Sequence, residues 1–346
     1  MNHFSPVEKH FFNLQDIKNQ STNIPYIVLE SFPQLGLITS LRFLEWASEN
    51  PKGVISLPTG KTPEHFIKWT HHILNNWDKK EVIDIRNRNG LTIDEKPDLA
   101  NLKFVQIDEF YPLNPNQHNS FYNYVCKYYI EGFGMNIDNA LLINSDEIPL
   151  ANDNDRRKIF PDNTIDLTLR FREAENDNEK EQQESIFLID QWCAEYENKI
   201  RSIGGIGFFL GGIGPDGHIA FNVRGSDHNS TTRLTGTNFE TQAAAATDLG
   251  GIEISRNRLV ITIGLRTITY NPDATGIIIA AGEAKSLIIK NSLEKSPDVK
   301  YPATALTRLK HSCFYITKGA SKLLRDTENE YWENKTWDMP KKQKSL

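Results

Sequence analysis

The chain has 346 residues, of which 38% are hydrophobic, and a formal net charge of −6 at neutral pH. This length allows a large buried core, and the negative charge argues against nucleic acid and anionic membrane as partners. Three widely separated cysteines, Cys126, Cys193 and Cys313, form no metal-ligand pairs, so we expect reduced thiols in the cytoplasm and no bound metal. No apolar run has the length of a signal-peptide core at the N-terminus or of a membrane span anywhere.

Strands and helices alternate along the chain. A strand over 24–29 precedes a helix over 34–49, whose apolar residues recur at helical spacing, and a second strand covers 53–57. Further strands are expected over 102–107, 140–143, 206–210, 258–264, 275–281 and 312–317, with helices between most of them. The alternation predicts an α/β fold in which a mostly parallel sheet carries helices on both faces.

Charged or polar segments interrupt this pattern without marking a domain boundary, so residues 1–346 are read as one domain. Residues 78–101 are charged and turn-prone, and 146–185 form an acidic segment that precedes a helix over 186–203. Both are predicted to be surface excursions. Residues 223–251 read as a long loop, and a C-terminal tail begins at about 325.

The strand over 53–57 leads into Thr59, Gly60, Lys61, Thr62 and Pro63. Pro63 suits the first turn of a helix, so backbone N–H groups, two threonine hydroxyls and a lysine would converge at a helix N-terminus. This combination predicts a phosphate site, although the spacing is not that of a nucleotide P-loop. A helix N-terminus with no ligand is the simpler interpretation of this segment taken alone.

Two carboxylates follow the strand over 102–107, and such groups are costly to bury without a purpose or a partner. Asp108 is expected to face a crevice as a base. Glu109, on the alternate face, is expected to hold structure as part of a salt-bridged pair that caps the following loop. Aromatic residues in the helix that begins near Asn119 or Ser120 are more often core than ligand contacts.

The most informative stretch is residues 206–222, where an apolar strand gives way to Gly212, Gly214 and Gly217 and then to polar residues. Glycines let backbone N–H groups approach a ligand closely, at the strand end where α/β proteins bind substrates. Asp216 and His218 flank Gly217, so the carboxylate can orient the imidazole and raise its basicity. The alternative is a tight turn beside an ordinary surface histidine.

The same glycines match a dinucleotide-binding fingerprint, but their context does not. That fingerprint opens a helix and is followed by a strand ending in an acidic residue about 20 positions on. Here Pro215 and Asp216 occupy the turn, and a polar segment follows. Further along, Lys285 lies in the first turn of a helix, where it could meet a phosphate as a point charge or remain in solvent.

Together these segments resemble the glucosamine-6-phosphate deaminase family, whose superfamily includes 6-phosphogluconolactonase. The resemblance covers about residues 30–325 and depends mainly on the long Gly-Ile-Gly-Pro-Asp-Gly-His-Ile-Ala-Phe-Asn motif over 212–222. The Asp-Glu-Phe strand end and the His-Asn-Ser-Phe-Tyr segment over 118–122 favour the deaminase branch.

The resemblance implies a Rossmann-like three-layer fold and an aldose-ketose isomerisation coupled to loss of ammonia, without a cofactor. His218, oriented by Asp216, would assist opening of the sugar ring, and Asp108 would carry a proton between C2 and C1. Thr59, Gly60, Lys61, Thr62 and Lys285 would hold the 6-phosphate. The expected partner is a small-molecule sugar phosphate. The sequence is compatible with a homo-oligomer but does not define the number of subunits.

Two departures from the family pattern stand out. Val223 occupies the position of a family glutamate that completes a proton relay with the aspartate and histidine, and an aliphatic side chain cannot relay a proton. The segment over 243–247, Ala-Ala-Ala-Ala-Thr, replaces a family arginine that contacts the phosphate, a loss for which Lys61 could compensate. A lactonase and a non-catalytic sugar-phosphate binder are therefore kept as alternatives.

Overall fold

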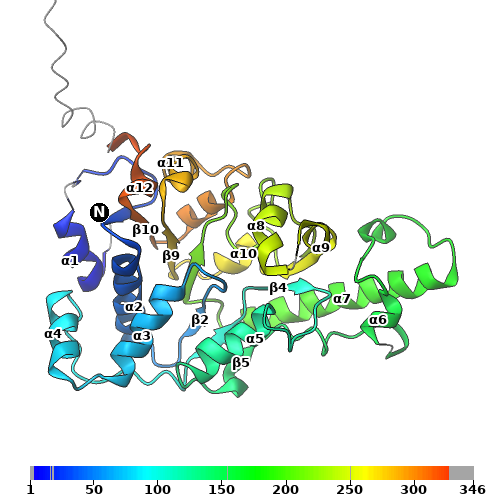
Figure 1. The fold of residues 1–346 in the computed structure, drawn as a ribbon, viewed down its shortest axis with the longest axis horizontal. Helices are drawn as coiled ribbons and strands as arrows, with labels where there is room; N and C mark the ends of the chain where they lie inside the picture. The colour runs from blue at the N-terminus through cyan, green and yellow to red at the C-terminus, as the bar shows by residue number, and fades with distance from the viewer. Residues whose placement is uncertain (1–3, 16, 18, 154, 250, 327–346) are drawn as a thin grey trace, which may run out of the picture.

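The computed structural model describes residues 4–15, 17, 19–153, 155–249 and 251–326. A seven-stranded sheet forms its centre, with the strand order β1-β10-β9-β6-β2-β3-β5 (Figure 1). The strands are β1 (Tyr26–Leu29), β2 (Val54–Ser56), β3 (Lys103–Val105), β5 (Ala140–Leu141), β6 (Phe208–Gly212), β9 (Thr275–Ala280) and β10 (His311–Thr317). Every pairing in this sheet is parallel, which confirms the predicted fold class.

Helices cover both faces of the sheet because alternate strand residues point to opposite sides. Phe208 and Leu210 of β6 pack into one core, and Phe209 packs into the other. The first core includes residues of α1 (Pro6–Leu14), α2 (Phe32–Glu49), α3 (Glu64–Asn75) and α4 (Lys80–Arg88). The second includes residues of α7 (Asp177–Ser202), α10 (Leu265–Ile268), α11 (Ser286–Glu294) and α12 (Lys318–Ser321). The result is three layers.

A second, antiparallel sheet has the order β4-β8-β7 and consists of β4 (Asp108–Tyr111), β8 (Leu259–Thr262) and β7 (Arg233–Thr235). The predicted strand over 102–107 is therefore divided, because β3 ends at Val105 and the chain then leaves the parallel sheet. The Gln106 side chain supports this departure by donating to the Asp108 carbonyl and accepting from the Ile143 amide. Asp108 thus begins a strand of the small sheet.

Three predicted loops or excursions contain regular structure. Residues 78–101 include α4, where Arg86 lies 3.6 Å above the Trp77 ring and donates to two backbone carbonyls. Residues 223–251 include β7 and α8 (Phe239–Leu249), and α9 (Ile252–Asn257) follows. The α7 helix begins at Asp177 rather than at 186, and α6 (Arg156–Ile159) precedes it. The predictions took charged and polar segments to be irregular, which was wrong because the exposed face of a surface helix is also polar.

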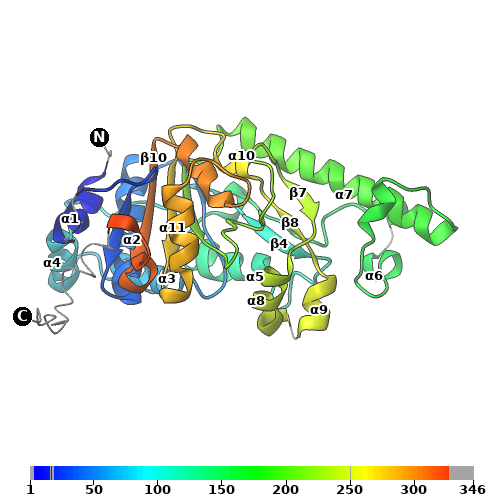
Figure 2. The same cartoon turned by 90° about the horizontal axis from the view of Figure 1, so that it is seen from above.

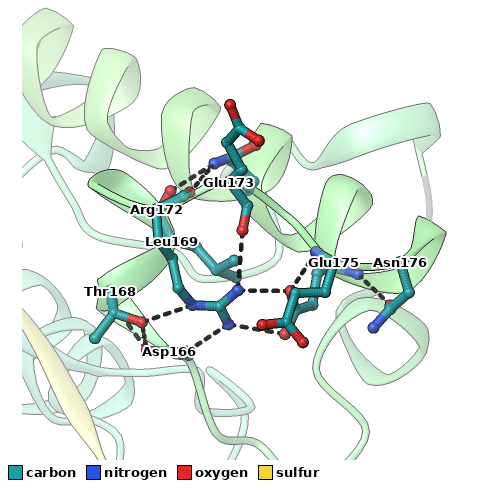
Figure 3. A network of polar contacts seen from close by, with 9 residues as sticks. Asp166, Thr168, Leu169, Arg172, Glu173, Glu175 and Asn176 are labelled. Carbon is teal, nitrogen blue, oxygen red and sulfur yellow. Dashed lines mark hydrogen bonds and ion pairs between the residues drawn. The ribbon is translucent and has the colours of Figure 1, made fainter.

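The first half of α7 extends away from the body of the molecule, with α6 near its far end (Figures 1 and 2). We call residues 146–190 the arm. A network around Arg172 orders the start of α7 (Figure 3): the guanidinium binds both carboxylate oxygens of Glu179 at 2.7 and 2.8 Å and also contacts Asp166 and Thr168. The hydrogen bonds from Arg172 lower the pKa of Glu179 to about 2. Part of the acidic segment is therefore paired rather than only solvated.

The second half of α7 is fastened to the body by a buried carboxylate. Glu197 accepts hydrogen bonds from the Thr232 amide and hydroxyl, from the Thr267 hydroxyl and from Arg201. Because a buried carboxylate without partners would be costly, this saturated set of hydrogen bonds fixes the segment before β7 and the α10 helix.

Within the described ranges, every helix is too short or too polar to cross a lipid bilayer.

The remaining elements connect these layers. They are α5 (Phe121–Val125), the π-helix η1 (Cys126–Glu131) and the short 3-10 helices η2 (Ile137–Asn139), η3 (Ala151–Asp153), η4 (Leu167–Arg170), η5 (Glu283–Lys285) and η6 (Pro302–Arg308). The predicted C-terminal tail lies, beyond Asp326, outside the described residues.

Candidate active site

A cavity of about 290 Å³ opens at the carboxyl ends of the central strands. Its walls come from the segments after β2, β3, β6 and β9, together with α5 and α8. β2 and β6 are neighbours from which the chain proceeds to opposite edges of the sheet, and α/β proteins bind ligands at such a switch point. The lining residues are Pro58, Thr59, Gly60, Lys61, Thr62, Ile107, Asp108, Phe110, Phe121, Gly211, Gly212, Ile213, Gly214, Pro215, His218, Ala220, Phe221, Thr241, Ala245 and Lys285.

The loop after β2 is built to receive an anion. Gly60 has a φ of +80°, a conformation that favours glycine, and α3 begins after Pro63 without a side-chain cap. In the described part of the chain, no acceptor is found for the backbone N–H groups of Gly60, Lys61 and Thr62. Free donors at the positive end of a helix dipole suit a phosphate group.

Two tyrosines support the loop after β2 by binding its carbonyl groups. The Tyr124 hydroxyl donates to the Gly60 carbonyl at 3.0 Å, and the Tyr129 hydroxyl donates to the Pro58 carbonyl. Both tyrosines belong to the helical segment formed by α5 and η1. The carbonyl groups of the loop are thereby turned towards protein donors, which leaves its N–H groups available to the cavity. Sequence reasoning placed aromatics of this segment in the core and did not identify this supporting role.

Lys285 reaches the cavity from η5, directly before α11. Its ammonium group donates to the Ile213 carbonyl at 2.8 Å. Burial lowers the pKa of Lys285, and the nearby charge of Asp216 acts in the opposite direction. The lysine is therefore fixed against the loop that carries the aspartate and histidine rather than extended into solvent.

Asp216 and His218 form a tight pair. Oδ1 of Asp216 lies 2.5 Å from Nδ1 of His218, and the Asp216 side chain is fully buried. Burial alone would raise the pKa of Asp216, but hydrogen bonds from His218, the Arg224 amide and Asn238 outweigh it and lower the pKa. Because Nδ1 faces a carboxylate, it carries a proton, and Nε2 is the ring nitrogen left for a substrate.

The glycines around this pair have distinct roles. A Cβ on Gly214 would lie only 2.0 Å from Cε1 of His218, so the imidazole occupies the space that any side chain there would need. Gly217 has a φ of +89°, and a Cβ would meet Ile288 at 2.8 Å, so it shapes the turn from behind the cavity. Gly212 lines the cavity, where a Cβ would approach Thr62 at 3.2 Å.

Asp108 faces these groups from the start of β4 and is buried. Burial raises the pKa of Asp108 well above its ordinary value, and the neighbouring Glu109 raises it further. Among the described residues, no hydrogen bond or ion pair reaches its carboxylate. An unpartnered buried carboxylate on a cavity wall is a strong base once it loses its proton.

Glu109 points away from the cavity and supports the adjacent helix. Its carboxylate accepts hydrogen bonds from the Phe110, Phe121 and Tyr122 amides and from the Ser120 hydroxyl. Burial raises its pKa to about 7 against these four donors, which favour the charged form. The prediction that Glu109 caps the following segment is confirmed, through hydrogen bonds rather than a salt bridge.

An aromatic wall closes one side of the cavity. Phe110, Phe121 and Phe221 form a small cluster, in which the last two rings are stacked, and the His218 ring is stacked on Phe221. Ala220, between His218 and Phe221, has a φ of +50°, which is uncommon for a residue with a side chain and marks local strain. The wall offers an apolar face to a ligand and restrains the imidazole.

The predicted site residues converge on this one cavity. All of them line it except Asp216, which lies behind His218 and binds it, and Gly217, which shapes the turn. Val223 is half-buried and does not line the cavity. The segment over 243–247 belongs to α8, from which Ala245 reaches the cavity wall. The described residues contain no group of three His, Cys, Asp or Glu side chains suited to a metal ion.

Sequence reasoning missed the contribution of α8, because it read 223–251 as a loop. Thr241 lines the cavity, and Asn238 contacts Asp216. Four consecutive alanines over 243–246, preceded by Asn238 as a helix cap, are a helix signal that could have revealed this element.

Comparisons with known proteins point in one direction. No family model matches the chain. A glucosamine-6-phosphate isomerase of Candida albicans is 38% identical over 118 residues, which span 34% of this chain and 48% of that protein. A glucosamine-6-phosphate deaminase of Caenorhabditis elegans is 29% identical over 77% of this chain and 78% of its own length. One from Borrelia garinii is 25% identical over 81% and 83%, respectively.

Solved structures show the same fold. A monomeric glucosamine-6-phosphate deaminase of the NagB superfamily superposes with a TM-score of 0.65 at 19% identity, over 87% of this chain and all of that chain. The 6-phosphogluconolactonase of Leishmania guyanensis superposes with a TM-score of 0.53 at 15% identity, over 86% and 98%. The architecture is thus shared with both groups.

Proposed function

The chain is a homologue of glucosamine-6-phosphate deaminases with the fold of the NagB superfamily, and from this premise we propose that it is a 6-phosphosugar isomerase and deaminase. Its substrate would be glucosamine 6-phosphate or a related amino-sugar phosphate. The reaction converts the amino sugar and water into a ketose phosphate and ammonia.

The observation that carries the proposal is the convergence in one cavity of a phosphate-binding loop, a buried carboxylate and an aspartate-imidazole pair. These three features come from segments far apart in the chain. A phosphate bound at Thr59–Thr62 and Lys285 would fix the sugar carbons against Asp108 and His218, and such positioning can supply much of a rate enhancement.

Each group has a separate role. Nε2 of His218, with Nδ1 held by Asp216, moves a proton between the anomeric hydroxyl and the ring oxygen, which opens the ring. Asp108 then removes the proton from C2 and returns it to C1. With one proton lost from the amine and one gained by the C1 oxygen, the aldehyde at C1 becomes a hydroxymethyl group and the amine at C2 becomes an imine. Water adds to C2, and ammonia leaves. The aromatic wall shields these steps from bulk water.

The first test is turnover of glucosamine 6-phosphate, measured both as ammonia release and as ketose phosphate. Asp108→Asn should lower both signals at least about 100-fold, and Asp273→Asn is the control because Asp273 is exposed and does not line the cavity. Wild-type activity in Asp108→Asn would contradict the assigned role of this residue.

The same variants separate the proposal from a lactonase, the activity named for several structural neighbours. A lactonase needs His218 but should tolerate loss of Asp108, so 6-phosphogluconolactone hydrolysis that survives Asp108→Asn and disappears in His218→Gln would support it. If phosphosugars raise the melting temperature but none is turned over, the chain is instead a sugar-phosphate binder.

We also propose that the protein is located in the cytoplasm. Its support is that Cys126, Cys193 and Cys313 are all free thiols, as expected for a reducing compartment. Alkylation of three thiols in protein isolated without reductant would agree with this location.

A further inference from the structure

The Asp216 carboxylate has two partners besides His218. Its Oδ2 atom accepts a hydrogen bond of 2.6 Å from Nδ2 of Asn238 and one of 3.1 Å from the Arg224 amide. Charge-assisted hydrogen bonds of this kind are among the strong ones in proteins. Among the described residues, only His218 and Asn238 form side-chain hydrogen bonds with this carboxylate.

Both ends of the Asn238 amide are in use. Its Oδ1 atom accepts from the Thr241 amide at 3.0 Å, which makes Asn238 the cap of α8. Its Nδ2 group donates to Asp216. One side chain therefore couples the start of α8 to the carboxylate that orients His218.

Thr241 reaches the pair from the same helix turn. Its hydroxyl lies 3.2 Å from Nδ1 of His218, the nitrogen that also faces Asp216. Thr241 lines the cavity, and its side chain is buried. The imidazole is thus restrained by a carboxylate, a hydroxyl and the Phe221 ring.

We propose that Asn238 and Thr241 are positioning residues, which hold the Asp216–His218 pair in its reactive orientation and supply the support that Val223 cannot. The proposal rests on the function proposed above. Val223 is aliphatic and lies outside the cavity lining, whereas α8 brings two hydrogen-bonding side chains directly onto the pair.

A capping role alone would require only Oδ1 of Asn238, so variants that keep the cap and lose the donor separate the two roles. Serine is a good cap but does not carry the amide group that reaches Asp216. Asn238→Ser should lower kcat about 10- to 100-fold while KM and the melting temperature stay near wild type. Asn238→Asp also keeps the cap but places a negative charge against Asp216.

The charge in Asn238→Asp makes a pH readout specific. Facing the pair are Lys285, on which the charge of Asp216 acts, Asp108 across the cavity and the Arg224 backbone amide. The titration of Asp108 is common to the wild type and the variant, so the difference between the two profiles reports on the pair. A second carboxylate beside Asp216 favours the protonated imidazole, so the acidic limb of kcat/KM should move to higher pH. A cap that is merely structural would not shift this limb.

Thr241 allows a matched rescue. Thr241→Val removes the hydroxyl at nearly constant shape and should lower kcat, whereas Thr241→Ser keeps the hydroxyl and should retain most of it. Glu240→Ala, at an exposed position of the same helix, is the control. Wild-type kcat in both Asn238→Ser and Thr241→Val, together with an unshifted pH profile in Asn238→Asp, would overturn the proposal.

A measurement without substrate keeps this test independent of the proposed function. The Nδ1 proton of His218 in a 2.5 Å hydrogen bond should give a strongly downfield NMR signal in the free protein. Asn238→Ser and Thr241→Val should shift or broaden that signal, and Glu240→Ala should not. An unchanged signal in the first two variants would overturn the positioning role even if the wild-type protein turned over no amino sugar.

Discussion

The Lys285 ammonium group donates a hydrogen bond of 2.8 Å to the carbonyl of Ile213. A side chain that precedes α11 is thereby anchored to the loop that follows β6 and carries Asp216. Since the ammonium group has further hydrogens to donate, it can hold its place and still contact an anion in the cavity.

We expect Lys285→Met to raise KM for glucosamine 6-phosphate about 10-fold or more, with a smaller change in kcat, because the lost charge acts on the phosphate rather than on the reacting carbons. Steady-state kinetics would show this, with Lys300→Met, at an exposed position, as the control. An equal loss on unphosphorylated glucosamine would contradict a phosphate-binding role.

The buried base predicts a pH dependence of catalysis. Burial, and secondly Glu109, raise the pKa of Asp108, so the carboxyl group becomes protonated as pH falls through a value well above its ordinary ~3.9. kcat/KM should therefore decline on the acidic side well above pH 4, and Asp108→Asn should lower kcat by about 100- to 10,000-fold at pH values above the pKa of Asp108. An acidic limb at or below pH 4 would refute this assignment.

The same shift predicts a gain in stability when the base is removed. A carboxyl group whose folded-state pKa is raised stabilises the fold below its unfolded pKa, and this contribution is lost as pH rises towards the folded value. Asp108→Asn should thus raise the melting temperature at pH 8 relative to wild type, and less so at pH 4. Calorimetry at both values checks this; a lower melting temperature at pH 8 would disagree with it.

Gly214 and Gly212 offer a matched pair of substitutions. Gly214→Ala would place a methyl group within 2.0 Å of the His218 ring and displace it, so we expect kcat/KM to fall about 100-fold. Gly212→Ala meets Thr62 at 3.2 Å and should cost less. Circular dichroism would confirm that both variants fold, and similar kinetics for the two would show that the ring does not need this space.

The network around Arg172 predicts local order in the arm. The pKa of Glu179 is lowered chiefly by hydrogen bonds from Arg172, so its stabilising contribution is present above its unfolded value of ~4.3 and is lost as pH falls towards 2. Arg172→Met should speed hydrogen exchange over residues 175–182 at pH 7 and leave kcat within about twofold.

Lys180→Met is the matched control, because Lys180 pairs with Asp177, whose side chain is 96% exposed. Such a surface pair contributes little. Equal exchange in the two variants would show that the Arg172 network does not order the start of α7.

The parallel sheet and its two helical layers were predictable because buried strands are continuous apolar runs. Residues 275–280, for example, are all buried in β9. The split between β3 and β4 was not predictable in this way: Phe104 and Phe110 are both buried apolar residues, and only the side-chain bonds of Gln106 reveal where the chain changes sheets.

The site residues were predicted by type and position, since glycine, carboxylate and imidazole at strand ends have few other uses. The role of α8 was not, because its contacts with Asp216 and His218 join residues about 20 positions apart, and hydrogen bonds of this kind leave no periodic signal. Similarly, Tyr124 and Tyr129 are indistinguishable from core aromatic residues in the sequence. Only the structure shows that their hydroxyl groups bind carbonyl groups of the loop after β2.

The placement of the arm separates two parts of the chain that can change independently. No described residue between Phe121 and Gly211 lines the cavity, and Glu197 fastens α7 to the body on the near side of the arm. Shortening the outer turns of α7, or grafting a reporter sequence onto its tip, would thus alter the outline of the molecule while leaving substrate turnover intact.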